Sequence, residues 1–143
     1  MVLELLQSGY GERKDLNCSE SILYAANSAY KLGLSERALK LSSGFGRGMA
    51  IETTCGVLTG AVMVLGLLTV DTVAHQSFEV KFLTKELIER FEAALGDIEC
   101  INLVPRYRTL EHKCNPLIFK AAEILDDIVI REKLLERYRS GDE

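Results

Sequence analysis

An uncharged apolar run from Cys55 to Val70 is the feature that most limits what this chain can fold into. It is shorter than the roughly 20 residues that a membrane-spanning helix needs, and Asp71 closes it. Small residues at Gly56, Gly60 and Gly66 suit close contact with neighbouring helices. We therefore predict a buried core helix and no membrane insertion.

The rest of the chain also favours helices over strands. No long stretch alternates apolar and polar residues, and the chain has only 2 prolines. We predict an all-α fold, an irregular bundle of five or six helices, in a single domain spanning residues 1–143. The expected helices, with their N-caps where one is marked, are Val2–Gln7, a helix from the Asn17 cap to Gly33, one from the Ser35 cap to Gly44, the apolar helix after Thr53 or Thr54, Phe78–Leu95, a short turn after Asp97, and a last helix from the Asn115 cap to Tyr138.

Apolar side chains at helical spacing predict which faces are buried. In the helix over 78–95 the inner stripe is expected to hold Phe82, Leu83, Leu87, Ile88, Phe91 and Leu95. In the helix after Ser35 the expected buried residues are Ala38, Leu39 and Leu41. A glycine-rich loop, Ser43–Met49, is expected to follow.

Charge and targeting signals narrow the function classes. The chain has 17 Lys+Arg against 21 Asp+Glu, a formal net charge of −4, which argues against general nucleic-acid binding. The start of the chain lacks the basic and apolar segments of a secretory signal. We therefore expect a cytoplasmic protein, in a reducing compartment where structural disulfides are rare. A chain of this length needs neither disulfide nor metal to fold.

The chain nevertheless carries 4 cysteines, and each lies at a predicted helix N-terminus. The unpaired N–H groups and partial positive charge at such an end favour an anion. A thiol placed there is expected to have a lowered pKa and to be a better nucleophile or metal ligand. The four are Cys18 after Asn17, Cys55 after Thr54, Cys100 in the turn after Asp97, and Cys114 just before Asn115 and Pro116.

Two other interpretations of the cysteines stay open. Cysteine often acts as a small buried hydrophobe, so the four could simply be core residues. A structural zinc ion is another role, although no Cys-x-x-Cys pair occurs. Either role would suit a non-redox helical binding module.

The glycine-rich loop supplies a second group of candidates, at Gly44, Gly46, Arg47 and Gly48. It matches neither the dinucleotide-binding nor the P-loop pattern. The structural role is favoured, in which glycine lets the backbone pass close to the start of the Cys55 helix. In a cofactor-binding role the loop N–H groups would donate to a sulfur ligand or an anion, with Arg47 adding charge.

The two histidines give a third hypothesis. His75 or His112 could serve as base for a nucleophilic Cys55, as in a cysteine hydrolase. No partner spacing supports this pairing, so the sequence does not decide whether the protein is an enzyme.

Three segments together resemble the redox-active C_GCAxxG_C_C family. They are Asn17–Leu23, Ser43–Met49 and Thr54–Ala61, and Cys100 and Cys114 match the two later cysteines of the family pattern. The resemblance runs from about Asn17 to Leu125. The sequence departs from the family's Gly-Cys-Ala-x-x-Gly motif, because Thr54 and Gly56 flank Cys55 and the next glycine, Gly60, lies one position after the place of the motif's final glycine.

The resemblance implies that the four cysteines act together. We expect a cytoplasmic redox or electron-transfer protein whose thiols hold an iron–sulfur cluster or cycle between dithiol and disulfide. For thiol cycling Cys55 is the expected attacking thiolate, because Gly56 and the glycine loop would leave it unshielded. The redox partner is not identified by any residue, and the apolar helices are compatible with a homodimer.

Overall fold

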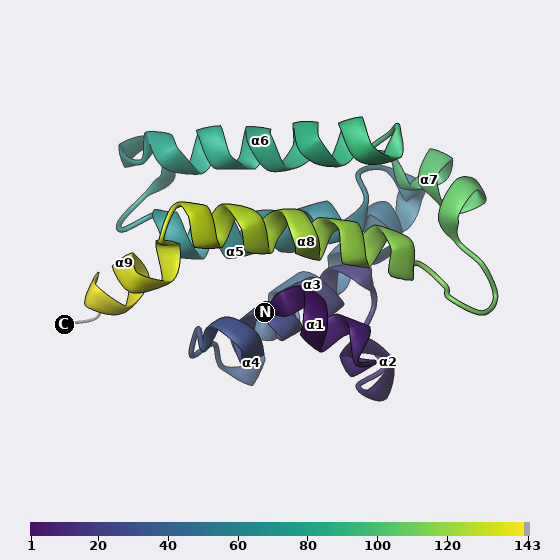
Figure 1. Cartoon of the computed structure of the whole chain (residues 1–143), viewed down its shortest axis with the longest axis horizontal. Coiled ribbons are helices and arrows are strands. Elements are labelled where there is room, and N and C mark those ends of the chain that lie inside the picture. Colours follow the sequence, from purple (N-terminus) through teal and green to yellow (C-terminus); the bar gives the residue numbers. More distant parts are fainter. Residues whose placement is uncertain (142–143) are drawn as a thin grey trace.

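The chain is built from helices, as a computed structural model that describes residues 1–141 shows (Figure 1). Within that range there are nine α-helices and no strand, so the all-α class is confirmed and the helix count exceeds five or six. The last two residues of the predicted 1–143 domain lie outside the described part. The helices are α1 (Val2–Gln7), α2 (Tyr10–Arg13), α3 (Cys18–Tyr30), α4 (Glu36–Leu39), α5 (Gly56–Thr69), α6 (Phe78–Leu95), α7 (Cys100–Tyr107), α8 (Asn115–Arg131) and α9 (Leu134–Gly141), with short turns η1 (Lys40–Phe45), η2 (Gly48–Glu52) and η3 (Ala74–Gln76).

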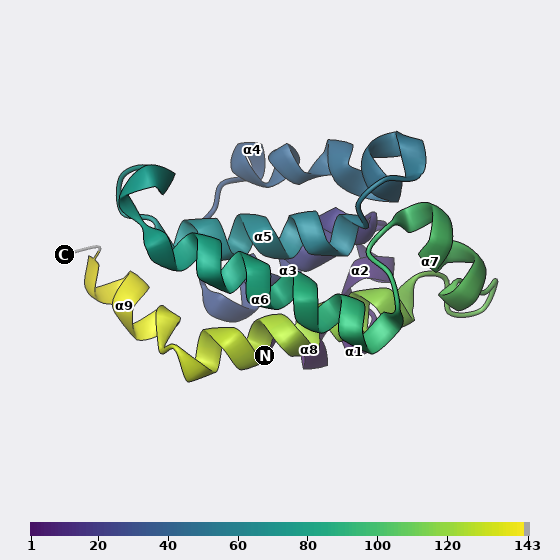
Figure 2. The ribbon, with the colours of Figure 1, turned by 90° about the horizontal axis from the view of Figure 1, so that it is seen from above.

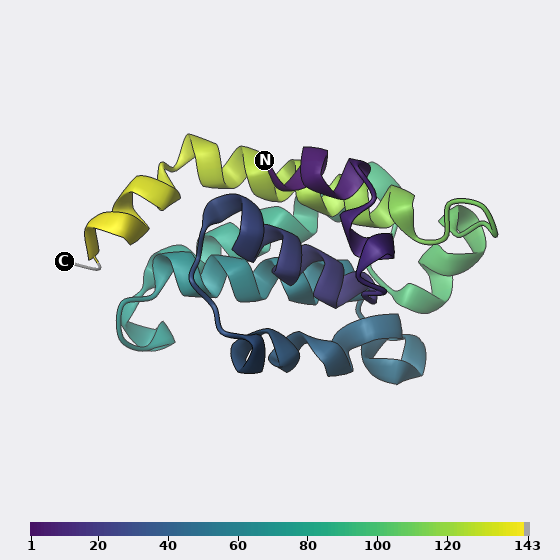
Figure 3. The same ribbon diagram turned by 90° about the horizontal axis from the view of Figure 1, so that it is seen from below.

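Helix α5 is the centre of the core. It packs against α3 on one side, against α6 and α8 on others, and against α9 near its C-terminal end (Figures 2 and 3). Its residues Val57, Leu58 and Leu65 are fully buried. The prediction of a buried core helix is confirmed. No helix in residues 1–141 is both long and apolar enough to cross a membrane.

A buried carboxylate, Asp126 on α8, ties three helices together. It accepts hydrogen bonds from the backbone N–H groups of Val2 at 3.1 Å and Leu3 at 3.0 Å, which hold the start of α1. It also accepts one from the Tyr30 hydroxyl on α3, at 2.6 Å. The N-terminal helix is thereby fixed against the two helices that lead to Cys18 and Cys114.

Local capping chemistry sets several helix ends where the sequence predicts them. Asn17 accepts from the Glu20 N–H at 2.9 Å and Glu20 accepts from the Asn17 N–H at 2.9 Å, so the capping box is present. Ser35 caps α4 by accepting from Ala38. Helix α6 has the predicted bounds, and Gly96, with φ of 90°, ends it.

The prediction of burial is wrong for two residues. Phe82 is 69% exposed, because α6 turns the face of Leu83, Leu87 and Phe91 towards α5 and α8 and leaves Phe82 to solvent. Leu41 is also 69% exposed. It lies in η1, a tight 3₁₀ turn to which α-helical spacing does not apply, and Ser42 is the residue buried there.

Several predicted boundaries also shift. Neither Thr53 nor Thr54 caps α5; Cys55 itself is its N-cap, and the Thr53 carbonyl instead accepts from the Cys100 N–H. Asn115 is the first residue of α8 and not its cap. The last predicted helix is broken at Lys133, whose φ is 54°, so that α9 leaves in a new direction.

Candidate functional site

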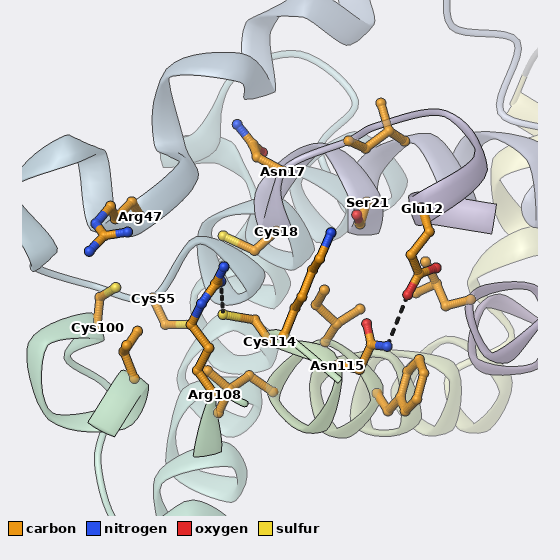
Figure 4. Close-up of a pocket in the computed structure, with 18 of the residues that line it drawn as sticks. Glu12, Asn17, Cys18, Ser21, Arg47, Cys55, Cys100, Arg108, Cys114 and Asn115 are labelled. Atoms are coloured by element: carbon orange, nitrogen blue, oxygen red, sulfur yellow. Dashed lines mark hydrogen bonds between the residues drawn. The ribbon is translucent and has the colours of Figure 1, made fainter. Parts of the chain in front are cut away.

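All four cysteines line one cavity of about 280 Å³ (Figure 4). Figure 4 shows their side chains grouped at one end, while Glu12, Ser21 and Asn115 lie towards the other. Three cationic residues also line the cavity. They are Arg47, Arg108 and Lys113.

Each cysteine begins a different helix. Cys18 is the first residue of α3 and Cys100 the first of α7, while Cys55 and Cys114 are the N-caps of α5 and α8. The prediction that all four lie at helix N-termini is confirmed. Four helix ends with unpaired N–H groups therefore meet at the thiol end of the cavity.

Glycines are what allow these helix ends to approach so closely. A β-carbon at Gly56 would lie 2.5 Å from the Cys18 sulfur and 2.9 Å from the Phe45 carbonyl oxygen. At Gly48, where φ is 60°, it would lie 2.6 Å from the Thr53 nitrogen. Such distances exclude a side chain, so these two positions require glycine for packing.

The glycine-rich loop contributes one side chain to the cavity. Of its four candidates only Arg47 lines it. Gly46 lies against Asn17, where a β-carbon on the glycine would be 2.5 Å from the amide nitrogen, and Gly48 lies against Cys100. Gly44 has open space around it. The predicted structural role of the loop fits Gly46 and Gly48, and the predicted added charge fits Arg47.

The loop backbone is strained where it passes the cavity. Four residues other than glycine have left-handed φ angles, at 54°, 58°, 67° and 63° for Arg47, Met49, Ala50 and Glu52. Each such residue costs on the order of 1 kcal/mol, and strained backbone is concentrated at functional sites. The backbone of Arg47 acts to lower the pKa of Cys18, although by less than burial raises it.

Burial, however, has the largest effect on the pKa of three of the thiols. It raises the pKa of Cys18 and Cys100, and it raises the pKa of Cys55 to about 12. The expected lowering of these pKa values is therefore wrong, because the helix ends lie inside the molecule. Cys55 is only 3% exposed, so the expectation of an unshielded attacking thiolate is also wrong.

The thiols also act on one another's pKa values. In addition to burial, repulsion from neighbouring thiols raises the pKa of Cys18, of Cys55 and of Cys100. A negative charge on one of these sulfurs therefore disfavours a second.

Arg108 is a site residue that no sequence pattern indicated. Its Nη1 donates a hydrogen bond to the Cys114 sulfur at 3.2 Å (Figure 4). A short reversal of the chain makes this contact, since Thr109 and Lys113 pair their backbones at 2.8 and 3.3 Å. Nothing in the spacing of Arg108 and Cys114 signals the contact, because only the fold of the intervening loop creates it.

Neither histidine lies on the cavity. His75 is in η3, after the C-terminal end of α5, and His112 Nε2 lies 3.8 Å from a Glu111 carboxylate oxygen. The predicted pairing of Cys55 with a histidine base is wrong.

The four thiols are free and border an open space. None forms a disulfide. Within residues 1–141 no three or more His, Cys, Asp or Glu side chains lie close enough together to hold a single metal ion. The donor set is four sulfurs around a cavity.

The comparisons agree with this cysteine pattern. A family model described as "Putative redox-active protein (C_GCAxxG_C_C)" matches residues 16–128. No curated protein and no solved structure is similar enough to give a match.

Proposed function

The chain belongs to the C_GCAxxG_C_C family, and from that premise we propose that the cavity is a redox site whose four cysteines hold an iron–sulfur cluster. One observation carries the proposal: four thiols from four separate helix starts converge on one cavity. Scattered core cysteines would not be expected to converge in this way. The cysteines are thus proposed to act as one unit.

The donor set supports an iron–sulfur cluster by its chemistry and its number. Clusters of two or four irons are held by four cysteine thiolates. Four cysteines line this cavity, which is the number of thiolates that such a cluster needs. When bound, a cluster supplies reversible one-electron chemistry. Cys18, Cys55, Cys100 and Cys114 are the proposed ligands.

The charges around the cavity favour the same function. Thiolate ligands bring negative charge into a partly buried space, which costs free energy unless it is offset. The cavity is lined by three cationic side chains, Arg47, Arg108 and Lys113, and by two carboxylates, Glu12 and Asp15. The four helix N-termini add partial positive charge. Because burial keeps the pKa of Cys55 at about 12, loading must displace protons from neutral thiols. We therefore expect loading to be stronger at higher pH.

The test is anaerobic purification and reconstitution with ferrous iron and sulfide. We expect a brown protein with charge-transfer absorption, and bound iron and sulfide in a fixed ratio to protein. Cys18→Ser, Cys55→Ser, Cys100→Ser and Cys114→Ser should each lose most of the bound iron. His112→Ala is the matched control, since it lies two residues from Cys114 but off the cavity, and it should load normally.

A folded wild-type protein that stays colourless and iron-free after reconstitution would overturn the cluster proposal. Zinc bound in equal molar amount to the protein, and lost in the same four serine variants, would instead favour a structural metal site in a non-redox module.

Thiol–disulfide cycling is the second candidate, and the Arg108–Cys114 hydrogen bond favours it. A guanidinium N–H stabilises a thiolate, and Cys114 is only half-buried, so Cys114 is the proposed attacking thiol in place of Cys55. In the cycle two thiols would give up two electrons and two protons to an oxidised partner as one S–S bond forms. Mass spectrometry of protein equilibrated in glutathione buffers would detect the disulfide and identify its two cysteines.

A further inference from the structure

Three large apolar side chains are exposed where η2 meets α7, beside the redox cavity. Ile51 is 74% exposed, Ile101 is 57% exposed and Met49 is 42% exposed. We call these three residues, with the exposed cationic residues Arg47, Arg108 and Lys113, the η2–α7 surface. Exposed apolar groups rimmed by charge are typical of interaction sites.

The two halves of this surface are joined through the site itself. The Cys100 N–H donates to the Thr53 carbonyl at 2.6 Å, and Thr54 pairs with Glu99 across the same junction. Cys100 is only 5% exposed, but its neighbour in the chain is the exposed Ile101. A protein docked on these apolar side chains would therefore contact the two paired segments that lead to Cys55 and Cys100.

The exposed charge at this surface is locally positive. Arg47, Arg108 and Lys113 are all exposed, and none enters an ion pair with another residue of the described chain. Ile101 lies in the first turn of α7, and Arg108 directly follows its last residue.

Carboxylates also lie near this surface. Glu52 and Glu99 are half-buried, and the exposed Glu111 lies beside His112. Glu12 and Asp15 are exposed and line the same cavity, where Glu12 accepts a hydrogen bond from Asn115. The three cations therefore outnumber the two carboxylates among the residues that line the cavity, on a chain whose formal net charge is −4.

We propose that the η2–α7 surface docks an electron-carrier protein whose own docking face has an apolar centre and a rim of carboxylates. This inference rests on the proposed redox function of the cavity. One electron would pass from the reduced site to the oxidised carrier, with no bond made and no proton moved between the two proteins. Transient electron-transfer contacts of this kind are small, and opposite charges steer them.

Charge also argues against a second copy of this chain as the occupant. A symmetric dimer brings the same patch of each subunit face to face. The patch that holds Arg47, Arg108 and Lys113 would then face the same patch of the other copy, and like charges in a contact repel. An acidic partner relieves this repulsion.

The test measures electron transfer from the dithionite-reduced, reconstituted full chain to two probe carriers by stopped flow. The probes are an acidic flavodoxin and the basic cytochrome c. Net charge of −4 alone predicts that added salt slows the reaction with cytochrome c and speeds the reaction with flavodoxin. The η2–α7 surface predicts the opposite sign for flavodoxin. We expect the flavodoxin rate to be highest at low ionic strength and to fall as salt is added.

Variants locate the contact. Ile51→Ser and Ile101→Ser should each slow transfer to flavodoxin about three- to tenfold, as for loss of an apolar contact central to an interface. Phe82→Ser is the matched control, since Phe82 is as exposed as these residues but lies on α6, and its rate should not change. Oxidation by a small neutral quinone should be equal in all four proteins.

Equal flavodoxin rates for Ile51→Ser and Phe82→Ser, or a flavodoxin rate that rises as salt is added, would overturn the docking proposal. If no cluster assembles, the proposed function fails separately. Docking would then be measured on the unloaded chain from NMR shifts of isoleucine methyl groups on adding flavodoxin. Shifts at Ile51 and Ile101 would support the surface, and their absence would reject it.

Discussion

Gly56 lies against Cys18 so closely that a β-carbon on the glycine would be 2.5 Å from the sulfur. The Phe45 carbonyl oxygen would lie 2.9 Å from the same β-carbon, so a side chain at this position would clash with a second atom. The start of α5, the start of α3 and the end of η1 meet at this point. The absence of a side chain at Gly56 therefore sets how near Cys18 and Cys55 can be.

Gly56→Ala tests this directly. The added methyl group must displace either the thiol or a backbone oxygen, so the free energy of unfolding in urea should fall by about 1–3 kcal/mol. Iron bound after reconstitution should fall as well. Gly66→Ala, on the same helix with open space around it, is the control and should raise stability by about 0.5–1 kcal/mol. Equal effects of the two variants would contradict the packing argument.

Asp126→Ala should be among the most destabilising polar substitutions in the chain. It leaves the Tyr30 hydroxyl and the N–H groups of Val2 and Leu3 without their buried acceptor. We expect the free energy of unfolding to fall by about 2–4 kcal/mol. Asp127→Ala removes an exposed carboxylate paired with Arg90 and should cost less than about 1 kcal/mol. Chemical denaturation of both variants gives the comparison.

The ion pairs at Glu86 predict one component of acid sensitivity. Hydrogen bonds from Arg131, at 2.7 Å, and from Arg90, at 3.0 Å, lower the pKa of Glu86 to about 2 from an ordinary value of 4.5. A lowered carboxyl pKa stabilises the fold above pH 4.5, and this contribution is lost as pH falls from 4.5 to 2. Because these side chains are partly exposed, its size is about 1 kcal/mol or less.

Glu86→Gln should therefore reduce stability at pH 7 and match the wild type near pH 2. Glu89→Gln, which removes only an exposed partner 3.8 Å from Lys85, should leave the pH profile unchanged. Thermal unfolding across this pH range measures both. A constant difference between Glu86→Gln and wild type at every pH would contradict the assignment.

The thiols of the metal-free protein should react in a fixed order with iodoacetamide. Burial raises the pKa of Cys55 to about 12, so at pH 8 its thiolate is scarce and also shielded. Cys114, half-buried and bonded to Arg108, should be alkylated first. Cys55 should react last, at least about a hundredfold more slowly. Peptide mapping over time gives the order, and in urea the four rates should converge.

Much of the fold follows from local chemistry. The Asn17–Glu20 capping box and the terminal Gly96 each act within one helical turn, so the sequence alone placed α3 and α6 well. The break before α9 has no such signal, since Lys133 adopts a left-handed φ where glycine would be expected. Leu134 is fully buried against the rest of the fold, and the spacing of apolar residues along one helix does not reveal this burial.

Some properties of the candidate site also follow from local sequence, and others depend on tertiary structure. That each cysteine begins a helix is a local property and was predictable. Thiol pKa values depend instead on how deeply four helix ends are buried together, which reversed the expected direction for Cys18, Cys55 and Cys100. Arg108 reaches Cys114 only through the folded loop between them.

The four-helix origin of the site has a consequence for biogenesis. No segment shorter than residues 18–114 contains all four cysteines, and Cys114 gains its position only when α8 packs on α5. During translation the chain must therefore pass Cys114 and then extend through α8 before the last thiol is in place. Cofactor delivery would accordingly have to be timed after synthesis, and a chain interrupted before Cys114 would present three thiols with no fourth.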